Sequence, residues 1–254
     1  IERFVTAAKA AGTDLSSFSF AFSGAMALPA ATAAAWEEAT GGYAIEGYGM
    51  TETSPVALGN PIGPTRRPGT VGVPFPSIHI RVVAVDDPSH DVAQGEPGEL
   101  LIRGPQVFQG YWGRPDETAA VLLPGGWLRT GDIVTESDDG FVTVIDRIKE
   151  LIITGGFNVS PSEVEDVLLS HPDIEDAAVV GIPRPSGSEE ITAAVVMKPD
   201  AVFDADALRD FCRTRLTAYK VPRRVVQLDE LPRSLVGKVL RRTVRDELIA
   251  AERS

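Results

Sequence analysis

The sequence changes character at Asp146, and this change constrains the fold more than any other feature. Before it, short β-branched runs such as residues 78–85 are separated by proline and glycine pairs, a pattern typical of antiparallel strands in a small distorted barrel. After it, apolar runs alternate with segments of helical spacing, which predicts a compact α+β unit. We therefore predict two domains, residues 1–145 and residues 146–254.

Local signals predict individual elements in both parts. The clearest helix start is Ser160, because Pro161 takes the first helical position and Glu163 stands three residues after the cap. A strand is expected at residues 19–23 and a helix at residues 29–40, as in an α/β fold. Further strands are expected at residues 100–103, 127–135, 141–145, 177–180 and 191–197, and helices after Pro115, at about 205–216 and at 241–250. An apolar run at residues 151–153 opens the second part.

Composition excludes several classes of protein. A net charge of −12 and a pI near 4.7 argue against a general nucleic-acid binder, because no basic stripe neutralises phosphates. Cys212 is the single cysteine and the chain has three histidines, which excludes an internal disulfide and a Cys/His metal cage and favours a reducing cytoplasm. No apolar run approaches the roughly 20 residues that span a bilayer. The chain does not begin with Met, so we expect a cut-down chain.

The first segment with chemical potential is residues 46–53, in which two glycines bracket Tyr48 and a hydroxyl and a carboxylate follow. Glycine permits close backbone approach and positive φ. Such a loop could stack a nucleobase on Tyr48, hold a phosphate with Thr51 and bind hydrated Mg²⁺ through Glu52. The alternative is a plain strand-to-helix turn with a buried tyrosine.

Three other segments are weaker signals when each is taken alone. Asp132 follows a glycine turn, and its two carboxylate oxygens could accept hydrogen bonds from two neighbouring sugar hydroxyls. Aspartate at a turn, however, is usually structural. Residues 146–150 are a charged cluster at the change of character, and such clusters are usually solvated linkers. Lys238 follows Gly237 ahead of a helix, but the spacer and leading glycine of a phosphate-binding loop are absent. An ordinary surface lysine is the alternative.

The order and spacing of these segments resemble the adenylate-forming superfamily of acyl- and aryl-CoA synthetases, peptide-synthetase adenylation domains and beetle luciferases. The resemblance covers residues 23–242, and its ordered segments are residues 23–25, 47–52, 98–100 with 110–112, 130–132, 146–150, 155–159 and 237–238. It implies the C-terminal part of a large AMP-binding domain with a barrel-like subdomain, followed by a small mobile domain. It also implies a magnesium-dependent ligase that uses ATP and coenzyme A in fatty acid metabolism.

The resemblance implies a two-step reaction and assigns roles in the first part of the chain. A carboxylate attacks the α-phosphorus of ATP to give an acyl-adenylate and pyrophosphate, and the thiol of coenzyme A then displaces AMP. Asp132 would bind ribose hydroxyls, Thr51 a phosphate and Glu52 the magnesium ion. The remaining matches to nucleotide- or acyl-contacting positions are Gly24, Ala25, Glu46, Gly47, Tyr48 and Gly49.

Roles in the second part follow from the same resemblance. Lys238 matches a lysine that enters the site during adenylation, where an ammonium can offset charge on the α-phosphate and the attacking carboxylate. Asp146 matches the hinge about which the small domain rotates between the half-reactions. Arg147 would bind the ribose. Lys149 and Asn158 match residues that approach the adenylate in the thioester-forming state, and Gly155 and Gly156 match the strip along which the pantetheine arm passes.

One departure from the family pattern matters for activity. The Ser/Thr/Gly-rich phosphate loop with its own lysine is not found in these 254 residues, so we expect an inactive fragment of a longer ligase. Residues 45–55 and 234–242 look most like bacterial fatty-acid-CoA ligases. Aryl-CoA ligases, peptide-synthetase adenylation domains, luciferase-like enzymes and a non-catalytic nucleotide-binding relative stay open as alternatives. Peripheral membrane association, oligomeric state and acyl chain length stay open as well.

Overall fold

The structure is a computed structural model that describes residues 1–24, 28–185, 187–234 and 237–252. The chain divides into two compact units, Ile1–Val144 and Ile145–Ser254. The division falls one residue before the boundary expected from the sequence, inside the strand β9, Val142–Arg147. Within the described ranges, no helix has both the length and the apolar character that crossing a membrane requires.

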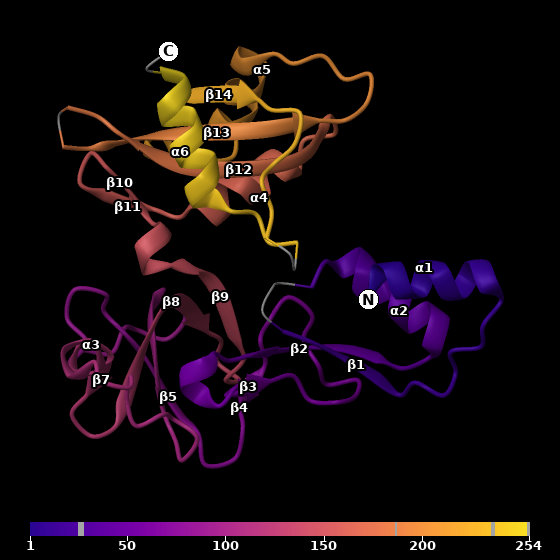
Figure 1. The fold of residues 1–254 in the computed structure, drawn as a ribbon, viewed down its shortest axis with the longest axis vertical. Helices are drawn as coiled ribbons and strands as arrows, with labels where there is room; N and C mark the ends of the chain where they lie inside the picture. Colours follow the sequence, from indigo (N-terminus) through magenta and orange to yellow (C-terminus); the bar gives the residue numbers. More distant parts are fainter. Residues whose placement is uncertain (25–27, 186, 235–236, 253–254) are drawn as a thin grey trace. The chain divides into compact units, whose positions relative to one another are not determined.

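The first unit begins with a layer of two helices on a pair of parallel strands. Its elements are α1 (Glu2–Ala11), β1 (Phe20–Ser23), α2 (Ala30–Thr40) and β2 (Tyr43–Tyr48). Both helices lie on one face of β1 and β2 (Figure 1). Val5, Ala33, Trp36 and Ala44 form the core between them. The strand and helix expected here are confirmed, whereas α1 was not predicted, although Gly12 in the left-handed region ends it.

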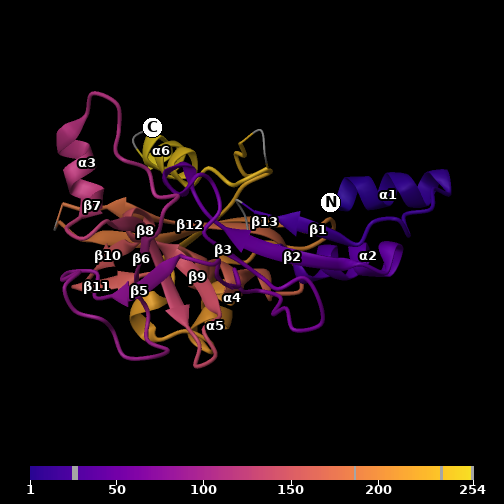
Figure 2. The ribbon, with the colours of Figure 1, turned by 90° about the horizontal axis from the view of Figure 1, so that it is seen from below.

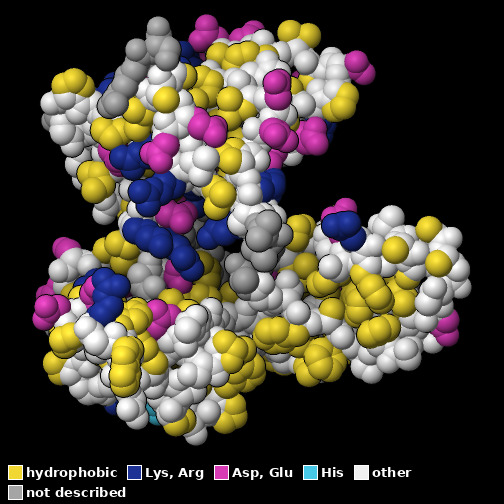
Figure 3. Space-filling model, in the orientation of Figure 1, with side chains coloured by type: hydrophobic (Ala, Val, Ile, Leu, Met, Phe, Trp, Pro, Cys, Tyr) yellow, Lys and Arg dark blue, Asp and Glu magenta, His cyan; other side chains and the backbone are white. Residues whose placement is uncertain are grey.

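Apolar side chains are also exposed on this part of the first unit. Four phenylalanines are each between two fifths and half exposed, and yellow side chains gather over the region of β1 and β2 in the space-filling view (Figure 3): Phe4, Phe18, Phe20 and Phe22. Phe4 and Phe18 both pack against the ring of Trp36. The aromatic cluster therefore continues from the small core to the surface.

The rest of the first unit is built mainly from antiparallel strands, as the short β-branched runs predicted. Strands β3 (Leu58–Gly59) and β4 (Val73–Pro74) extend the first sheet to the order β1-β2-β3-β4. A second sheet runs β5-β6-β8-β7, with β9 also paired to β8. Its strands are β5 (His79–Val83), β6 (Gly98–Arg103), β7 (Leu122–Leu123) and β8 (Trp127–Glu136), and the helix α3 (Pro115–Val121) precedes β7. The core contains Leu58, Leu100, Ile102 and Val134.

The second unit is a three-stranded sheet between helices, the α+β unit that the sequence predicted. The sheet order is β12-β13-β14, and a separate hairpin joins β10 to β11. Helices α4 and α5 lie on one face of the sheet and α6 on the other (Figure 2). The elements are η2 (Ile148–Glu150), β10 (Ile152–Thr154), β11 (Phe157–Val159), α4 (Pro161–Leu169), β12 (Ile174–Pro183), β13 (Glu189–Met197), α5 (Ala205–Arg213), η3 (Ala218–Lys220), β14 (Arg224–Gln227) and α6 (Arg241–Glu252).

Because both faces of this sheet are covered, β12 is apolar on both. Ala177 and Val179 pack toward α4 and α5, and Ala178 and Val180 pack toward α6, in the alternation of a pleated strand. Cys212 of α5 is fully buried in the first of these cores, and burial raises the pKa of its thiol to about 11. Helix α5 ends at Arg213, earlier than the predicted residue 216.

Candidate active site

Strand β2 carries the first candidate segment. Glu46, Gly47 and Tyr48 lie in the strand, so the predicted loop begins only after Tyr48. A Cβ at Gly47 would stand 2.1 Å from the ring of Phe22, and one at Gly49 would stand 1.8 Å from the carbonyl oxygen of Pro55. Both positions therefore require glycine because the protein packs tightly against them, and neither has a positive φ.

The Glu46 carboxylate holds two neighbouring loops by hydrogen bonds to their backbone N–H groups. One oxygen accepts the backbone N–H of Leu28 at 3.0 Å, and the other accepts that of Gly69 at 2.9 Å. The side chain is buried, with 7% of its surface exposed. These bonds give Glu46 a clear role in holding the segments on either side of β2.

Gly24 follows β1 and lies beside the same strand. A Cβ there would be 3.7 Å from the carbonyl oxygen of Gly47, which is ordinary contact. The structure thus brings the segments of Gly24 and Gly47 together. The candidate Ala25 lies outside the described residues.

Tyr48 and Asp132 meet although 84 residues separate them. The Tyr48 hydroxyl donates a hydrogen bond to Oδ2 of Asp132, which is only 2% exposed. Tyr48 closes β2 of the first sheet, and Asp132 lies on β8 of the second. Two segments that the sequence marked separately therefore form one polar contact within the first unit.

A bulge in β8 sets the direction of the Asp132 side chain. Glu99 pairs with Ile133 and Leu101 with Arg129, so three residues of β8 stand opposite Leu100 alone. The turn is closed by the Thr130 hydroxyl, which donates to the Leu100 carbonyl at 2.8 Å and accepts the Asp132 N–H at 3.1 Å. Bulges of this kind redirect a side chain and occur often beside functional sites.

A buried ion pair supports the bulge. Arg129 Nε donates to Glu99 Oε2 at 2.9 Å, and Glu99 Oε1 accepts the Gly131 N–H at 3.2 Å. Glu99 is 1% exposed whereas Arg129 is partly exposed, so removing Arg129 would leave a buried carboxylate without its ion-pair partner. The sequence placed Glu99 in a motif but gave it no role, because a contact across two strands leaves no local signal.

Thr51 and Glu52 lie on the short 3₁₀ helix η1 (Thr51–Thr53), where Thr51 is exposed and Glu52 half-buried. Tyr111 donates its hydroxyl hydrogen to Glu52 Oε1 at 2.7 Å, and the Phe108 N–H donates to the Glu52 carbonyl at 2.8 Å. The hydrogen bond to Glu52, together with burial and the charge of Glu52, raises the pKa of Tyr111 to about 12. Tyr111 therefore holds the Glu52 carboxylate as a neutral donor.

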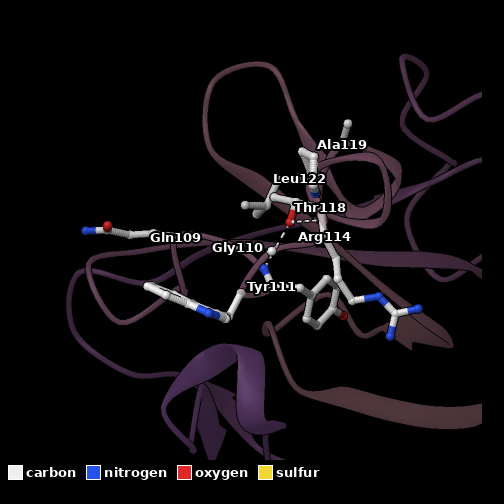
Figure 4. Close-up of a pocket in the computed structure, with 10 residues that line it drawn as sticks. Gln109, Gly110, Tyr111, Arg114, Thr118, Ala119 and Leu122 are labelled. Atoms are coloured by element: carbon white, nitrogen blue, oxygen red, sulfur yellow. Dashed lines mark hydrogen bonds between the residues drawn. The ribbon is translucent and has the colours of Figure 1, made fainter.

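The segment that carries Tyr111 also lines an open pocket of about 490 Å³ between residues 109 and 122. Figure 4 shows the Thr118 hydroxyl beside the backbone of Tyr111, whose N–H it accepts at 2.9 Å. The same hydroxyl donates to the Arg114 carbonyl at 2.9 Å. These bonds fix the turn, and through Tyr111 the turn reaches Glu52.

Glu52 is suited to bind a magnesium ion as its single protein ligand. Among the described residues, no group of three or more His, Cys, Asp or Glu side chains is placed to hold a metal ion. Mg²⁺ usually keeps several waters and binds one or two carboxylates together with substrate phosphates. The half-buried Glu52 carboxylate, steadied through Oε1, suits that arrangement.

In the second unit, Asp146 is buried and its carboxylate is held by several donors. Oδ1 accepts the Arg147 N–H at 2.8 Å, while Oδ2 accepts the Ser160 hydroxyl at 2.6 Å and the Ser162 N–H at 3.0 Å. Ser160 caps α4 as predicted, because its oxygen accepts the Glu163 N–H at 3.3 Å. Glu163 Oε1 accepts a hydrogen bond from Lys220 Nζ at 2.6 Å. At the start of α4, Asp146 Oδ2 is therefore a second acceptor beside the Ser160 hydroxyl.

Gly155 and Gly156 form the two-residue turn of the β10–β11 hairpin. Their φ angles are +56° and +83°, and Thr154 pairs with Phe157 on either side. A hairpin turn with positive φ at both central residues strongly favours glycine there. Among the described residues other than the chain neighbours, no atom lies within 4 Å of a Cβ built at either glycine, so the turn is open. Asn158, on the next strand, is exposed.

The two lysine candidates of the second unit are both exposed. Lys149 lies on η2. Lys238 lies on the loop before α6, where its N–H donates to the Ser234 hydroxyl at 3.1 Å and its carbonyl accepts the Ser234 N–H at 2.8 Å. The loop that presents the Lys238 ammonium is therefore hydrogen-bonded, while the side chain itself stands in solvent.

Two family models match this chain. The model of the AMP-binding enzyme matches residues 1–112, and the model of the AMP-binding enzyme C-terminal domain matches residues 163–238. The chain belongs to the AMP-binding, adenylate-forming enzyme superfamily.

Individual relatives agree with this assignment. The long-chain-fatty-acid–CoA ligase of Escherichia coli O157:H7 is 44% identical over 234 residues, which are 92% of this chain and 41% of that protein. The 2-succinylbenzoate–CoA ligase of Geobacillus kaustophilus is 45% identical over 199 residues, 78% of this chain and 40% of that protein. The crystal structure of ATP-bound MatB from Rhodopseudomonas palustris superimposes with a TM-score of 0.82 at 34% identity, covering 89% of this chain and 44% of that one.

The chain thus spans about two fifths of the length of the curated relatives it matches, and a similar share of the solved structure. The assignment to the superfamily and the mixed α/β fold class expected from the sequence are confirmed.

Proposed function

We propose that the complete protein is an ATP-dependent acid–CoA ligase that forms an acyl-adenylate and then an acyl-CoA thioester. The observation that carries the proposal is the hydrogen bond from Tyr48 to Asp132, which joins two candidate nucleotide segments from different sheets. A nucleotide at this position could place its base against Tyr48 and its ribose hydroxyls near Asp132. The identity to a long-chain-fatty-acid–CoA ligase supports the same reaction.

In the first unit the proposed roles fall on two groups of residues. Gly47, Gly49 and Tyr48 border the adenine and the acyl group, and Gly24 with Ala25 approaches the same nucleotide. Thr51 and Glu52 face the phosphates, where Glu52 would hold Mg²⁺ with substrate oxygens as further ligands. Bound Mg²⁺ would supply neutralising charge to the phosphates. Glu46 acts through the loops that it fastens.

In the second unit we propose that Lys238 serves adenylation. Its ammonium would offset the charge that develops on the α-phosphate and the attacking carboxylate. Arg147 would bind the ribose, and Lys149 and Asn158 would approach the adenylate during thioester formation. The open turn at Gly155 and Gly156 would let the pantetheine arm pass, because glycine carries no side chain that could block it.

The proposal also covers the domains. Residues 1–145 would be the C-terminal part of the large AMP-binding domain, and residues 146–254 the small mobile domain. Rotation about Asp146 would present Lys238 in the first half-reaction and the Gly155 turn in the second. We place the enzyme in the cytoplasm, because its single cysteine is free and buried, as suits a reducing compartment.

A long-chain fatty acid is the proposed acid, supported by the 44% identity to the Escherichia coli ligase. An aryl or arylalkyl acid is the second candidate, because the 2-succinylbenzoate–CoA ligase is 45% identical over its matched region. The experiment is an ATP- and CoA-dependent thioester screen of the complete protein with fatty acids of several lengths and with aryl acids. Turnover of aryl acids alone would reject the fatty-acid proposal, and nucleotide binding without pyrophosphate release would reject the ligase.

We further propose that the 254 residues by themselves form no acyl-adenylate. This part of the proposal is supported by the absence of a Ser/Thr/Gly-rich phosphate loop with its lysine from the sequence. ATP titration by calorimetry should therefore show weak binding, and a pyrophosphate assay should show no release. Measurable turnover with any carboxylic acid would contradict it.

A further inference from the structure

Arg241 stands at the centre of a polar cluster that no motif predicted. Its Nε donates to Glu165 Oε1 at 2.8 Å, and its Nη2 donates to the Ser162 hydroxyl at 2.8 Å. The same guanidinium forms ion pairs with Glu165 and Glu150 and lies 3.7 Å from Asp146 Oδ1. One side chain therefore joins its own helix α6 to four residues from two other segments of the second unit.

Each of these segments holds a candidate functional residue or a support for one. Asp146 and Glu150 begin the unit, Ser162 and Glu165 lie in the first turns of α4, and Arg241 is the first residue of α6. The carboxylates that Arg241 pairs with also accept backbone N–H groups, those of Arg147 and Ser162 at Asp146 and that of Val179 at Glu165. The guanidinium is thus connected through its partners to the main chain of the Asp146 segment, of α4 and of strand β12.

Arg241 is also three residues from Lys238 in the chain. The far side of the Lys238 loop is held by Arg233, which donates to the Gly237 carbonyl at 2.6 Å and forms an ion pair with Asp176 on β12. The Leu240 N–H donates to the Pro232 carbonyl at 2.8 Å, which closes the base of the loop. The path of the chain at Lys238 is therefore fixed on one side by Arg233 and on the other by Arg241.

We propose that Arg241 is a positioning residue for the reaction, because its guanidinium fixes both the Asp146 segment and the start of the helix that follows Lys238. This inference rests on the proposed function. A guanidinium suits the role, since it carries five N–H donors in a rigid plane that can serve several acceptors at once. A lysine has a single point of charge, so Arg241→Lys keeps the charge and loses the geometry.

The chain offers a matched control in the next residue. Arg242 is 94% exposed in its side chain, and its one ion pair in the part of the chain that the structure describes is with Asp246, at 4.0 Å. Arg241→Lys and Arg242→Lys are the same chemical change one position apart. In the complete protein, we expect Arg241→Lys to slow acyl-adenylate formation by about tenfold to a hundredfold, because small misplacements of a catalytic group have effects of this size. Thioester formation from supplied acyl-adenylate should fall less than about threefold, and Arg242→Lys should change neither.

A second measurement separates this inference from the proposed function. Hydrogen exchange of the complete protein should become faster in Arg241→Lys at the amides of Arg147, Ser162 and Val179, which donate to carboxylates held by Arg241. It should stay unchanged in Arg242→Lys. If Arg241→Lys does not fold, Glu165→Gln replaces it, since it removes one charge and keeps an acceptor.

The outcomes distinguish the two ideas. A wild-type protein that makes no adenylate overturns the proposed function, and the exchange data then still decide whether Arg241 orders the three segments. Faster exchange with equal losses in both half-reactions overturns the positioning role in favour of a purely structural one. Unchanged exchange and unchanged rates overturn it outright.

Discussion

Three candidate residues of the first unit are held by contacts inside the fold, whereas the two candidate lysines of the second unit stand on its surface. Tyr48, Asp132 and Glu52 each have a partner that fixes the functional atoms. Lys149 and Lys238 are exposed, and what the structure fixes there is the main chain from which the side chain projects.

This difference teaches where function and stability are coupled. In the first unit a substitution that removes a functional atom also removes a partner of a buried group, so both properties should change together. In the second unit an exposed side chain can be removed with little effect on folding, because exposed positions contribute within about 0.5 kcal/mol. The three predictions below test that contrast.

The largest effect is expected for Lys238→Ala in the complete protein. Loss of a preorganised charge contact commonly lowers a rate by about 10²–10³, and we expect this loss in adenylation alone. Thioester formation from supplied acyl-adenylate and the urea midpoint should both stay nearly unchanged. Lys9→Ala is the control, because Lys9 is an exposed lysine that pairs with Glu38 at 3.4 Å on the surface. Equal losses of rate in both half-reactions would contradict the proposed role of Lys238 in adenylation.

An intermediate effect is expected for Tyr48→Phe, which deletes the hydroxyl that donates to the buried Asp132 carboxylate. Leaving a buried acceptor short of a donor costs about 1–3 kcal/mol of folding free energy. Urea unfolding followed by tryptophan fluorescence measures this in the first unit, because Trp36, Trp112 and Trp127 all lie there.

Tyr43→Phe is the matched control for Tyr48→Phe, as Tyr43 begins the same strand. Its unfolding free energy should change by less than about 0.5 kcal/mol. If Tyr48→Phe weakened nucleotide binding and left stability untouched, the proposed coupling in the first unit would be broken.

The smallest effect is a pH dependence at Tyr111. Its pKa is about 12 in the folded chain, chiefly through the hydrogen bond to Glu52, and about 10 in an unfolded chain. The unfolded state therefore loses its proton first, and the stability that Tyr111 contributes is present below pH 10 and is lost toward pH 12.

The test compares the urea midpoints of wild type and Tyr111→Phe at several values between pH 8 and pH 11. We expect the advantage of the wild type to shrink as the pH rises. Glu52→Ala removes the acceptor and should abolish this trend. A constant difference across the range would show that the hydrogen bond does not hold the phenol proton.

Local patterns were enough for the parts of the fold that local forces decide. Ser160 was expected to cap α4 and does so, and the strand expected at residues 191–197 is part of β13. Strand β14 was missed because four residues of a parallel partner to β13 carry little periodicity. The predicted loop at Glu46 is a strand, because its pairing with β1 and β3 outweighs the glycine at 47.

The supports of the candidate site could not be predicted from the sequence. Tyr111 meets Glu52 across 59 residues, and Arg241 meets Glu165 across 76. Contacts at such separations depend on how sheets and helices pack, which a scan of local spacing does not contain. The sequence marked the residues of the proposed chemistry, and the structure adds those that hold them in place.

The burial of Cys212 has a consequence for spectroscopy. A thiol with a pKa of about 11 is ionised in roughly one molecule in ten thousand at pH 7, and Cys212 lies inside a packed core. Maleimide dyes should therefore not react with Cys212. The natural chain therefore serves as a labelling background without further engineering. A cysteine introduced at each of two exposed sites, one in each unit, would carry a donor and an acceptor fluorophore whose energy transfer reports the distance between the units of the 254-residue chain.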